Sequence, residues 1–175
     1  HVTFTVPDLR AAVAQVRSLG ATVVGESYAH PPWREAFIPP DSTHGVVIQL
    51  AQSDGVYPSA DELLATRTRD TASFPSVSGA TEPLWWSALW ETVPEATAKL
   101  GMTHLASTDS TFSRSLFEGV LGGSLRAGKD FLDFSWPSGS VRVHARDSPG
   151  LLGMSMWDGR TESVRIGSAR LGLPD

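Results

Sequence analysis

Apolar and polar side chains alternate over the first six residues of the chain. Val2, Phe4 and Val6 share one side, and this period of two is typical of a half-buried β-strand. Over residues 9–19 the apolar positions recur at helical spacing instead, so a helix with one apolar face follows. The sequence therefore begins with a strand and a helix, and Asp8 is the predicted N-cap residue of that helix.

Three further strands are predicted before residue 53. They cover residues 21–24, 33–38 and 46–51, and glycine or proline residues separate them. The turn before the last of these strands contains His44, which we expect to face solvent. Residues 1–52 therefore form a first module with the order β-α-β-β-β.

The same order of elements returns about a hundred residues later, which is the signature of a duplicated unit. The matched pairs are His1 and His104, Gly20 and Gly123, residues 33–39 and 131–137, and residues 46–50 and 141–145. We therefore predict a second βαβββ module over residues 102–147, with Thr111 as the N-cap residue of its helix.

The other two segments differ in composition from these modules. Residues 53–101 contain a stretch rich in Ser, Thr, Pro and Gly, which predicts a linker with short helices. Residues 148–175 alternate enough to hold one or two further strands. We expect an α+β fold in which the two modules pair into a curved sheet with the helices outside.

The polar face of each module is the face that its helix leaves uncovered. Matched polar residues lie on that face in both modules. The pairs are His1 and His104, Gln49 and His144, and Glu35 and Asp133. If the modules join edge to edge about a pseudo-twofold axis, these pairs converge on one cavity.

Four phrases in this order resemble the vicinal oxygen chelate superfamily, which includes glyoxalase I, methylmalonyl-CoA epimerase, extradiol dioxygenases and bleomycin-resistance proteins. The phrases are HVTFTVPDL at 1–9, WREAFIP at 33–39, HGVVIQLAQ at 44–52, and the strand, helix and Leu-Gly-Gly stop of 104–123. The resemblance implies a glyoxalase-like fold with a divalent metal between the modules.

The resemblance also implies which residues bind that metal. The family's ligand positions fall on His1, Gln49, His104 and His144, and imidazoles with an amide oxygen suit Zn, Co, Ni or Fe. The His-Gln-His beginning is nearest to methylmalonyl-CoA epimerase. His144 stands where that enzyme and glyoxalase I usually have Glu.

The implied activity is that of an isomerase or epimerase, with a glyoxalase-like lyase second, acting on a small carbonyl or acyl-thioester substrate by proton transfer. Glu35 and Asp133 are the candidate bases, since proton removal beside a carbonyl needs a base and an electrophile. Arg142 and Arg146 are candidates for binding a substrate carboxylate or phosphate. The alternative is a non-catalytic antibiotic-binding protein of the bleomycin-resistance type. Such proteins usually bind the drug at a dimer interface, so a homodimer is a further expectation.

Composition excludes several other classes of function. The net charge is −5 without a basic patch, which argues against nucleic acid as a partner. No apolar run is long enough to span a bilayer. The chain has no cysteine, which removes disulfides and thiolate chemistry and fits a cytoplasmic location.

Overall fold

The computed structural model describes residues 1–29, 33–53, 99–157, 164–166 and 169–171. Residues 54–98 of the predicted linker, with Trp85, Trp86 and Trp90, lie outside the described residues, as does His30, while residues 53 and 99–101 of that segment lie in strands.

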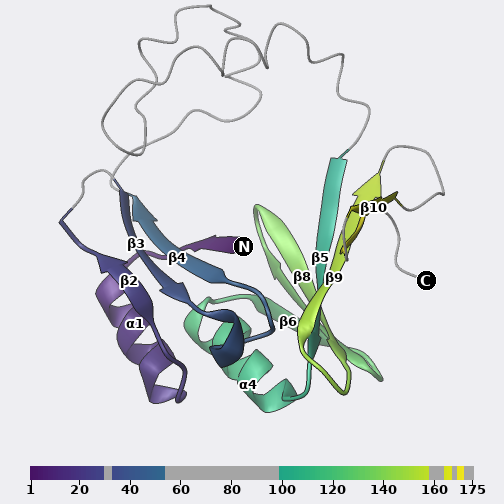
Figure 1. The fold of residues 1–175 in the computed structure, drawn as a ribbon, viewed down its shortest axis with the longest axis horizontal. Coiled ribbons are helices and arrows are strands. Elements are labelled where there is room, and N and C mark those ends of the chain that lie inside the picture. Colours follow the sequence, from purple (N-terminus) through teal and green to yellow (C-terminus); the bar gives the residue numbers. More distant parts are fainter. Residues whose placement is uncertain (30–32, 54–98, 158–163, 167–168, 172–175) are drawn as a thin grey trace, which may run out of the picture.

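The first module forms a four-stranded sheet in the order β1-β4-β3-β2, in which β1 runs parallel to β4. Figure 1 shows helix α1 beside this sheet. The elements are β1 (Val2–Thr5), α1 (Leu9–Ser18), β2 (Val24–Ser27), β3 (Trp33–Ile38), the 3₁₀ helix η1 (Pro40–Ser42) and β4 (Ile48–Ser53). The strand predicted at residues 21–24 begins three residues later than expected, while β3 has the predicted bounds.

The first helix begins and ends where the sequence predicts. The Asp8 carboxylate accepts a hydrogen bond from the Ala11 backbone N–H at 3.0 Å, which satisfies one of the free donors at the helix start. Gly20 has φ +85° just after the helix, a conformation that glycine adopts without strain. Leu9 and Val16 of this helix are fully buried.

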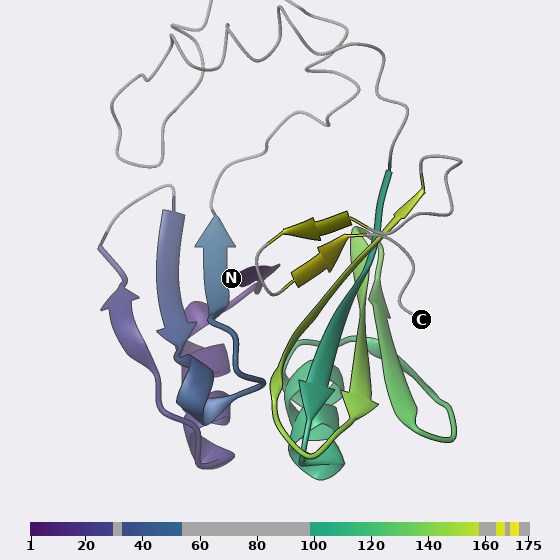
Figure 2. The ribbon, with the colours of Figure 1, turned by 45° about the vertical axis from the view of Figure 1, so that its right-hand side comes forward.

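The second module belongs to a seven-stranded sheet in the order β10-β11-β9-β5-β8-β7-β6. Figure 2 shows it opposite the first sheet. The strands are β5 (Lys99–Ser107), β6 (Ser124–Ala127), β7 (Phe131–Trp136), β8 (Gly139–Ala145), β9 (Gly150–Trp157), β10 (Val164–Ile166) and β11 (Ala169–Leu171). The described residues after 147 contain three strands, β9, β10 and β11, where we predicted one or two.

The helix of the second module is capped by Asp109, so the prediction of Thr111 as the N-cap was wrong. It starts as α4 (Ser110–Arg114) and continues as a π-helical segment, η3 (Ser115–Val120). The Asp109 carboxylate accepts from the backbone N–H groups of Thr111 and Phe112, both at 2.9 Å. Asp109 lies two residues before Thr111, and its carboxylate accepts from the N–H groups two and three residues later, as an N-cap side chain does, so the helix begins earlier than predicted.

Strand register supports the duplication. Thr3 pairs with Gln49 between β1 and β4, and Ala106 pairs with His144 between β5 and β8. Both strand pairs are parallel, so Gln49 and His144 occupy equivalent places, as predicted from the repeat.

The predicted match of the third strands was wrong by four residues. Gln49 pairs with Phe37, and its equivalent His144 pairs with Phe131. Phe37 and Phe131 are therefore equivalent, and Glu35 is not the counterpart of Asp133. An even shift keeps both carboxylates on the predicted face, because side chains alternate with period two.

One hydrophobic core joins the two modules. The Phe4 ring of β1 lies 5.8 Å from the Phe117 ring and 5.0 Å from the Trp136 ring, both in the second module. Buried residues of both modules belong to the same core cluster. The predicted α+β fold of two βαβββ modules is therefore confirmed.

Among the described strands, the two modules belong to separate hydrogen-bonded sheets. β1 pairs only with β4, and the second edge of β5 is taken by β9. The modules therefore pair through side-chain packing, whereas we had expected a junction along strand edges.

His44 is buried between the modules, so the expectation that it faces solvent was wrong. It is 1% exposed, and its ring lies 5.0 Å from the Phe117 ring. Its Nε2 is 2.8 Å from Ser113 Oγ on α4, and its Nδ1 is 2.8 Å from Thr43 Oγ1. Both ring nitrogens therefore have hydrogen-bond partners, which a buried imidazole requires.

Candidate functional site

Two of the four predicted metal ligands are in contact on the second sheet. His104 Nδ1 lies 3.0 Å from His144 Nε2, and the two rings stack with centroids 5.4 Å apart. They are brought together because β5 and β8 are adjacent parallel strands. The other nitrogen of His104, Nε2, lies 2.7 Å from Ser155 Oγ on β9.

Both imidazoles of this pair are disposed to stay neutral. Burial lowers the pKa of His104 to about 4, and the neighbouring His144 and Arg142 add to the effect. Burial also lowers the pKa of His144, with Arg146 and Arg142 contributing. Neutral imidazole is the form that carries a lone pair for a metal.

Asp133 lies on the same sheet and is held by two arginines. Its carboxylate accepts from Arg142 Nε at 2.6 Å and from an Arg142 terminal nitrogen at 2.9 Å. Arg126 donates to it at 3.0 Å. These hydrogen bonds, with Arg142 first, hold the pKa of Asp133 below its usual value. The Arg142 guanidinium also lies 4.1 Å from the centre of the Phe131 ring.

In the first module, Gln49 connects Glu35 to Thr3. Gln49 Nε2 donates to the Glu35 carboxylate at 2.7 Å, and Gln49 Oε1 accepts from the Thr3 hydroxyl at 2.8 Å. Gln49 is 8% exposed. The sequence therefore correctly predicted that Glu35 and Gln49 share a face, but it did not single out Thr3.

The four predicted ligands do not form one contact group. His1 precedes β1 and is exposed, whereas His104 is 3% exposed. Over the described ranges, no three or more His, Asp or Glu side chains gather so that they could hold a metal ion. The structure brings the predicted ligands together only as the pair in the second module.

This imidazole pair fits a metal as part of a ligand set. Two nitrogens on one tetrahedral zinc lie about 3.3 Å apart, since each Zn–N bond is about 2.0–2.1 Å, and the observed 3.0 Å separation is close to that. Metal-bound histidines usually donate their other ring N–H to a fixed partner, and Ser155 lies where such a partner is needed.

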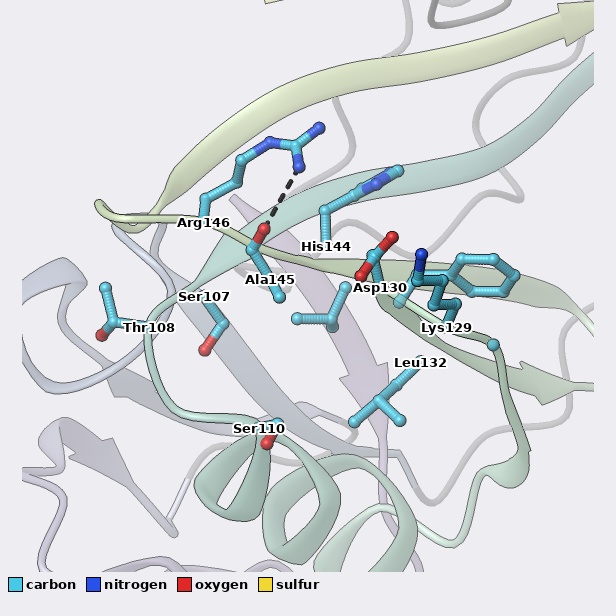
Figure 3. Close-up of a pocket in the computed structure, with 12 residues that line it drawn as sticks. Ser107, Thr108, Ser110, Lys129, Asp130, Leu132, His144, Ala145 and Arg146 are labelled. Atoms are coloured by element: carbon cyan, nitrogen blue, oxygen red, sulfur yellow. Dashed lines mark hydrogen bonds between the residues drawn. The ribbon is translucent and has the colours of Figure 1, made fainter.

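A hollow of about 280 Å³ beside His144 contains another predicted residue, Arg146. Figure 3 shows His144 on β8 and Arg146 just after that strand, with Lys129 and Asp130 nearby and the hydroxyl-bearing residues around Ser107 below. The Arg146 guanidinium donates to the Ala145 carbonyl oxygen at 3.1 Å. Arg146 is therefore open to solvent and to a ligand, whereas Arg142 is bound to Asp133.

A second cleft, of about 630 Å³, lies between β1 and the second module. The described residues that line it carry apolar side chains and hydroxyls, and none of them is charged. The lining side chains include Thr3, Phe4, Thr103, Trp136, Val141 and Met154. Neither His104 nor His144 lines this cleft, so it is distinct from the histidine pair.

Sequence reasoning missed Ser155 and Thr3 in these sites, and it missed the burial of His44. Ser155 belongs to β9, which lies beyond the repeat, so matching the modules gave no reason to select it. His44 follows a turn signal, and only the contact with the second module explains its burial.

None of the helices among the described residues is long and apolar enough to cross a membrane.

No protein-family model matches the sequence, and no curated protein matches it. Among solved structures, the chain is similar to a hypothetical protein from Staphylococcus aureus, with a TM-score of 0.55 and 12% identity over 95% of this chain and 61% of that one. This chain therefore covers less than two thirds of the length of that protein. The likeness extends to the fold alone.

Two weaker similarities concern proteins with named activities. One is 2,2',3-trihydroxybiphenyl 1,2-dioxygenase from Sphingomonas wittichii RW1, with a TM-score of 0.49 and 16% identity over 88% of this chain and 51% of that one. The other is the Mn(II)-bound glyoxalase from Novosphingobium aromaticivorans, with a TM-score of 0.47 and 16% identity over 87% and 44%. At these scores neither protein assigns an activity to this chain.

Proposed function

We propose that this chain is a vicinal oxygen chelate protein that binds a divalent metal through His104 and His144. The observation that carries the proposal is the 3.0 Å approach of His104 Nδ1 to His144 Nε2. The burial that keeps both rings neutral supports it. Imidazole ligands favour Zn, Co, Ni or Fe over Mg or Ca.

His1 and Gln49 are the proposed ligands from the first module. The register makes Gln49 the counterpart of His144, which supports its selection. Its amide oxygen accepts from Thr3, so Gln49 must exchange that hydrogen bond to serve as a ligand. His1 is exposed and precedes the first strand, so it is the ligand that we expect to contribute least.

The proposed activity is proton transfer next to a carbonyl, as in an isomerase, an epimerase similar to methylmalonyl-CoA epimerase, or a glyoxalase-like lyase. A bound metal would polarise the substrate oxygen. Glu35 is the better base of the two candidates, because Asp133 is bound to two arginines that lower its pKa. Arg146 is the better anchor for a substrate carboxylate or phosphate, because Arg142 is bound to Asp133.

The second candidate is binding of a small molecule without catalysis, in the manner of bleomycin-resistance proteins. The cleft of about 630 Å³ favours it, because the side chains that line it in the described part of the chain are apolar or carry hydroxyls and none is charged. Such walls suit an uncharged compound. A cytoplasmic location and a homodimer also remain proposals.

Solvent deuterium exchange tests the choice between these candidates. Cobalt-loaded protein is mixed in D₂O with a panel of small carbonyl compounds and acyl thioesters that carry a hydrogen next to the carbonyl. The proposed activity predicts deuterium at that carbon, loss of exchange after EDTA treatment, and at least tenfold slower exchange in Glu35→Gln.

Asp133→Asn serves as the comparison, since it is expected to slow the deuterium exchange less than Glu35→Gln does. Full exchange in Glu35→Gln would exclude Glu35 as the base. Absence of metal-dependent exchange with every compound would leave the binding candidate, which predicts that an uncharged aromatic compound stays bound after EDTA treatment in equilibrium dialysis.

A further inference from the structure

We propose that Ser155 is a positioning residue that fixes the His104 imidazole with its proton on Nε2. His104 Nδ1 then faces His144 with its lone pair. This inference rests on the proposed function, since it concerns the same histidine pair. It also gives a role to β9, the strand that follows the two duplicated modules.

The backbone brings Ser155 to His104. His104 pairs with Gly153 across β5 and β9, and Gly153 has no side chain at that place. Ser155 is two residues further along β9, so its side chain points to the same face as His104. Its Oγ lies 2.7 Å from His104 Nε2, and the serine is 7% exposed. A buried contact of this length fixes the ring in one orientation.

The proton on His104 can occupy either of two positions. A neutral imidazole carries one N–H, on Nδ1 or on Nε2. With the proton on Nδ1, His104 donates to His144 Nε2, and Ser155 donates its hydroxyl proton to His104 Nε2. With the proton on Nε2, His104 donates to Ser155 Oγ, and the Nδ1 lone pair accepts from His144 Nε2–H in the metal-free protein.

Only the second arrangement suits a shared metal. Each metal-binding nitrogen needs a lone pair, so His104 Nδ1 must carry no proton. Ser155 is the neighbour within hydrogen-bond distance that can accept from Nε2, because a serine hydroxyl accepts as well as donates. When Ser155 accepts from Nε2, His104 is held in the metal-competent tautomer before any metal arrives.

Nitrogen NMR of the metal-free protein tests this directly. Protein labelled with ¹⁵N at histidine is examined at a pH above neutrality, and the His104 ring is assigned by its disappearance in His104→Gln. The proposal predicts the Nε2–H tautomer for His104 in the wild type and a mixture of tautomers in Ser155→Ala. A wild-type ring with the proton on Nδ1 would overturn it.

Metal affinity provides the second test. Ser155→Ala should weaken cobalt binding by about 10–100-fold, which is the usual effect of removing such a partner. Ser155→Thr keeps the hydroxyl and should stay close to the wild type. Ser135→Ala removes an exposed serine from β7 and should change nothing. Equal cobalt affinity in Ser155→Ala and the wild type would contradict the proposed role.

The two tests separate this inference from the proposed function. If the wild type binds no cobalt, zinc or nickel, metal binding by His104 and His144 fails. The NMR result still decides whether Ser155 sets the tautomer, because it is obtained without metal.

Discussion

Some polar side chains are buried in the core of this protein and depend on hydrogen bonds to their neighbours. His44 is an example, because its hydrogen bond to Ser113 joins the turn of the first module to helix α4 of the second. Ser113 is fully buried and also contacts Ser107 and the Asp109 carbonyl oxygen. His44 is thus part of a polar network inside the core, where a missing partner is costly.

Replacing His44 with alanine should destabilise the protein by about 2–4 kcal/mol, because a cavity forms and Ser113 loses a partner. Urea unfolding followed by circular dichroism measures this. His1→Ala is the matched control, since His1 is exposed, and its effect should be within about 0.5 kcal/mol. Similar values for the two variants would show that the His44 contact does not stabilise the fold.

His44 also makes stability depend on pH. Burial lowers its pKa from 6.5 to about 4, partly opposed by Asp109. Between these two pH values the unfolded chain binds more protons than the folded one, so stability falls as the pH falls through this window. The loss from His44 is on the order of 3 kcal/mol, by the linkage between pKa and free energy.

His44→Gln tests this, because an amide can bond to Ser113 and does not titrate. Unfolding free energies measured from pH 6.5 down to 4 should fall less in the variant than in the wild type. The remaining fall includes His104, whose pKa is lowered in the same direction. Parallel curves for the two proteins would contradict the assignment.

At the scale of elements, local signals in the sequence predicted the helices and strands of each module well. Asp8 and Gly20 mark the ends of α1, and period-two alternation identified β1. The sequence did not reveal the offset of four residues between the third strands. Two short strands with the same alternation can be matched in more than one register. Glu35 and Asp133 were therefore matched wrongly although each lies on the predicted face.

The candidate site could be predicted only in part. His104 and His144 were found through the repeat and are in contact. The engagement of Asp133 with Arg126 and Arg142 depends on which residues meet across β6, β7 and β8, and the sequence does not specify that register. Ser155 came from outside the repeat.

Gly45 lies where the turn before β4 approaches the backbone at the start of β9. Its φ is +70°, and a Cβ there would lie 3.0 Å from the Cα of Gly150, which begins β9, and 3.0 Å from the carbonyl oxygen of Pro149, which precedes it. Gly45→Ala should therefore cost more than backbone strain alone, about 2–4 kcal/mol in total.

Gly20→Ala is the matched control for that variant, because Gly20 has φ +85° and open space around its Cβ position. It should cost about 1 kcal/mol from backbone strain. Thermal or urea unfolding of both variants gives the difference. Equal costs would mean that the approach of the two turns adds nothing to stability.

At the scale of the whole molecule, the two modules form one core but contribute unequally to the site. The second module supplies the adjacent imidazoles, and β9 supplies their hydroxyl partner. The first module contributes Gln49 and Glu35, which bond to each other. Metal binding should therefore depend on the second module much more than on the first.

Cobalt titration of the wild type and histidine variants measures this most directly. The account predicts binding of one cobalt ion per chain, a loss of affinity of at least about tenfold in His104→Gln and in His144→Gln, and a smaller loss in His1→Ala. His44→Gln, checked to be folded, is the control and should bind as the wild type does. Absence of cobalt binding to the wild type, or binding that survives in both His104→Gln and His144→Gln, would contradict the central claim.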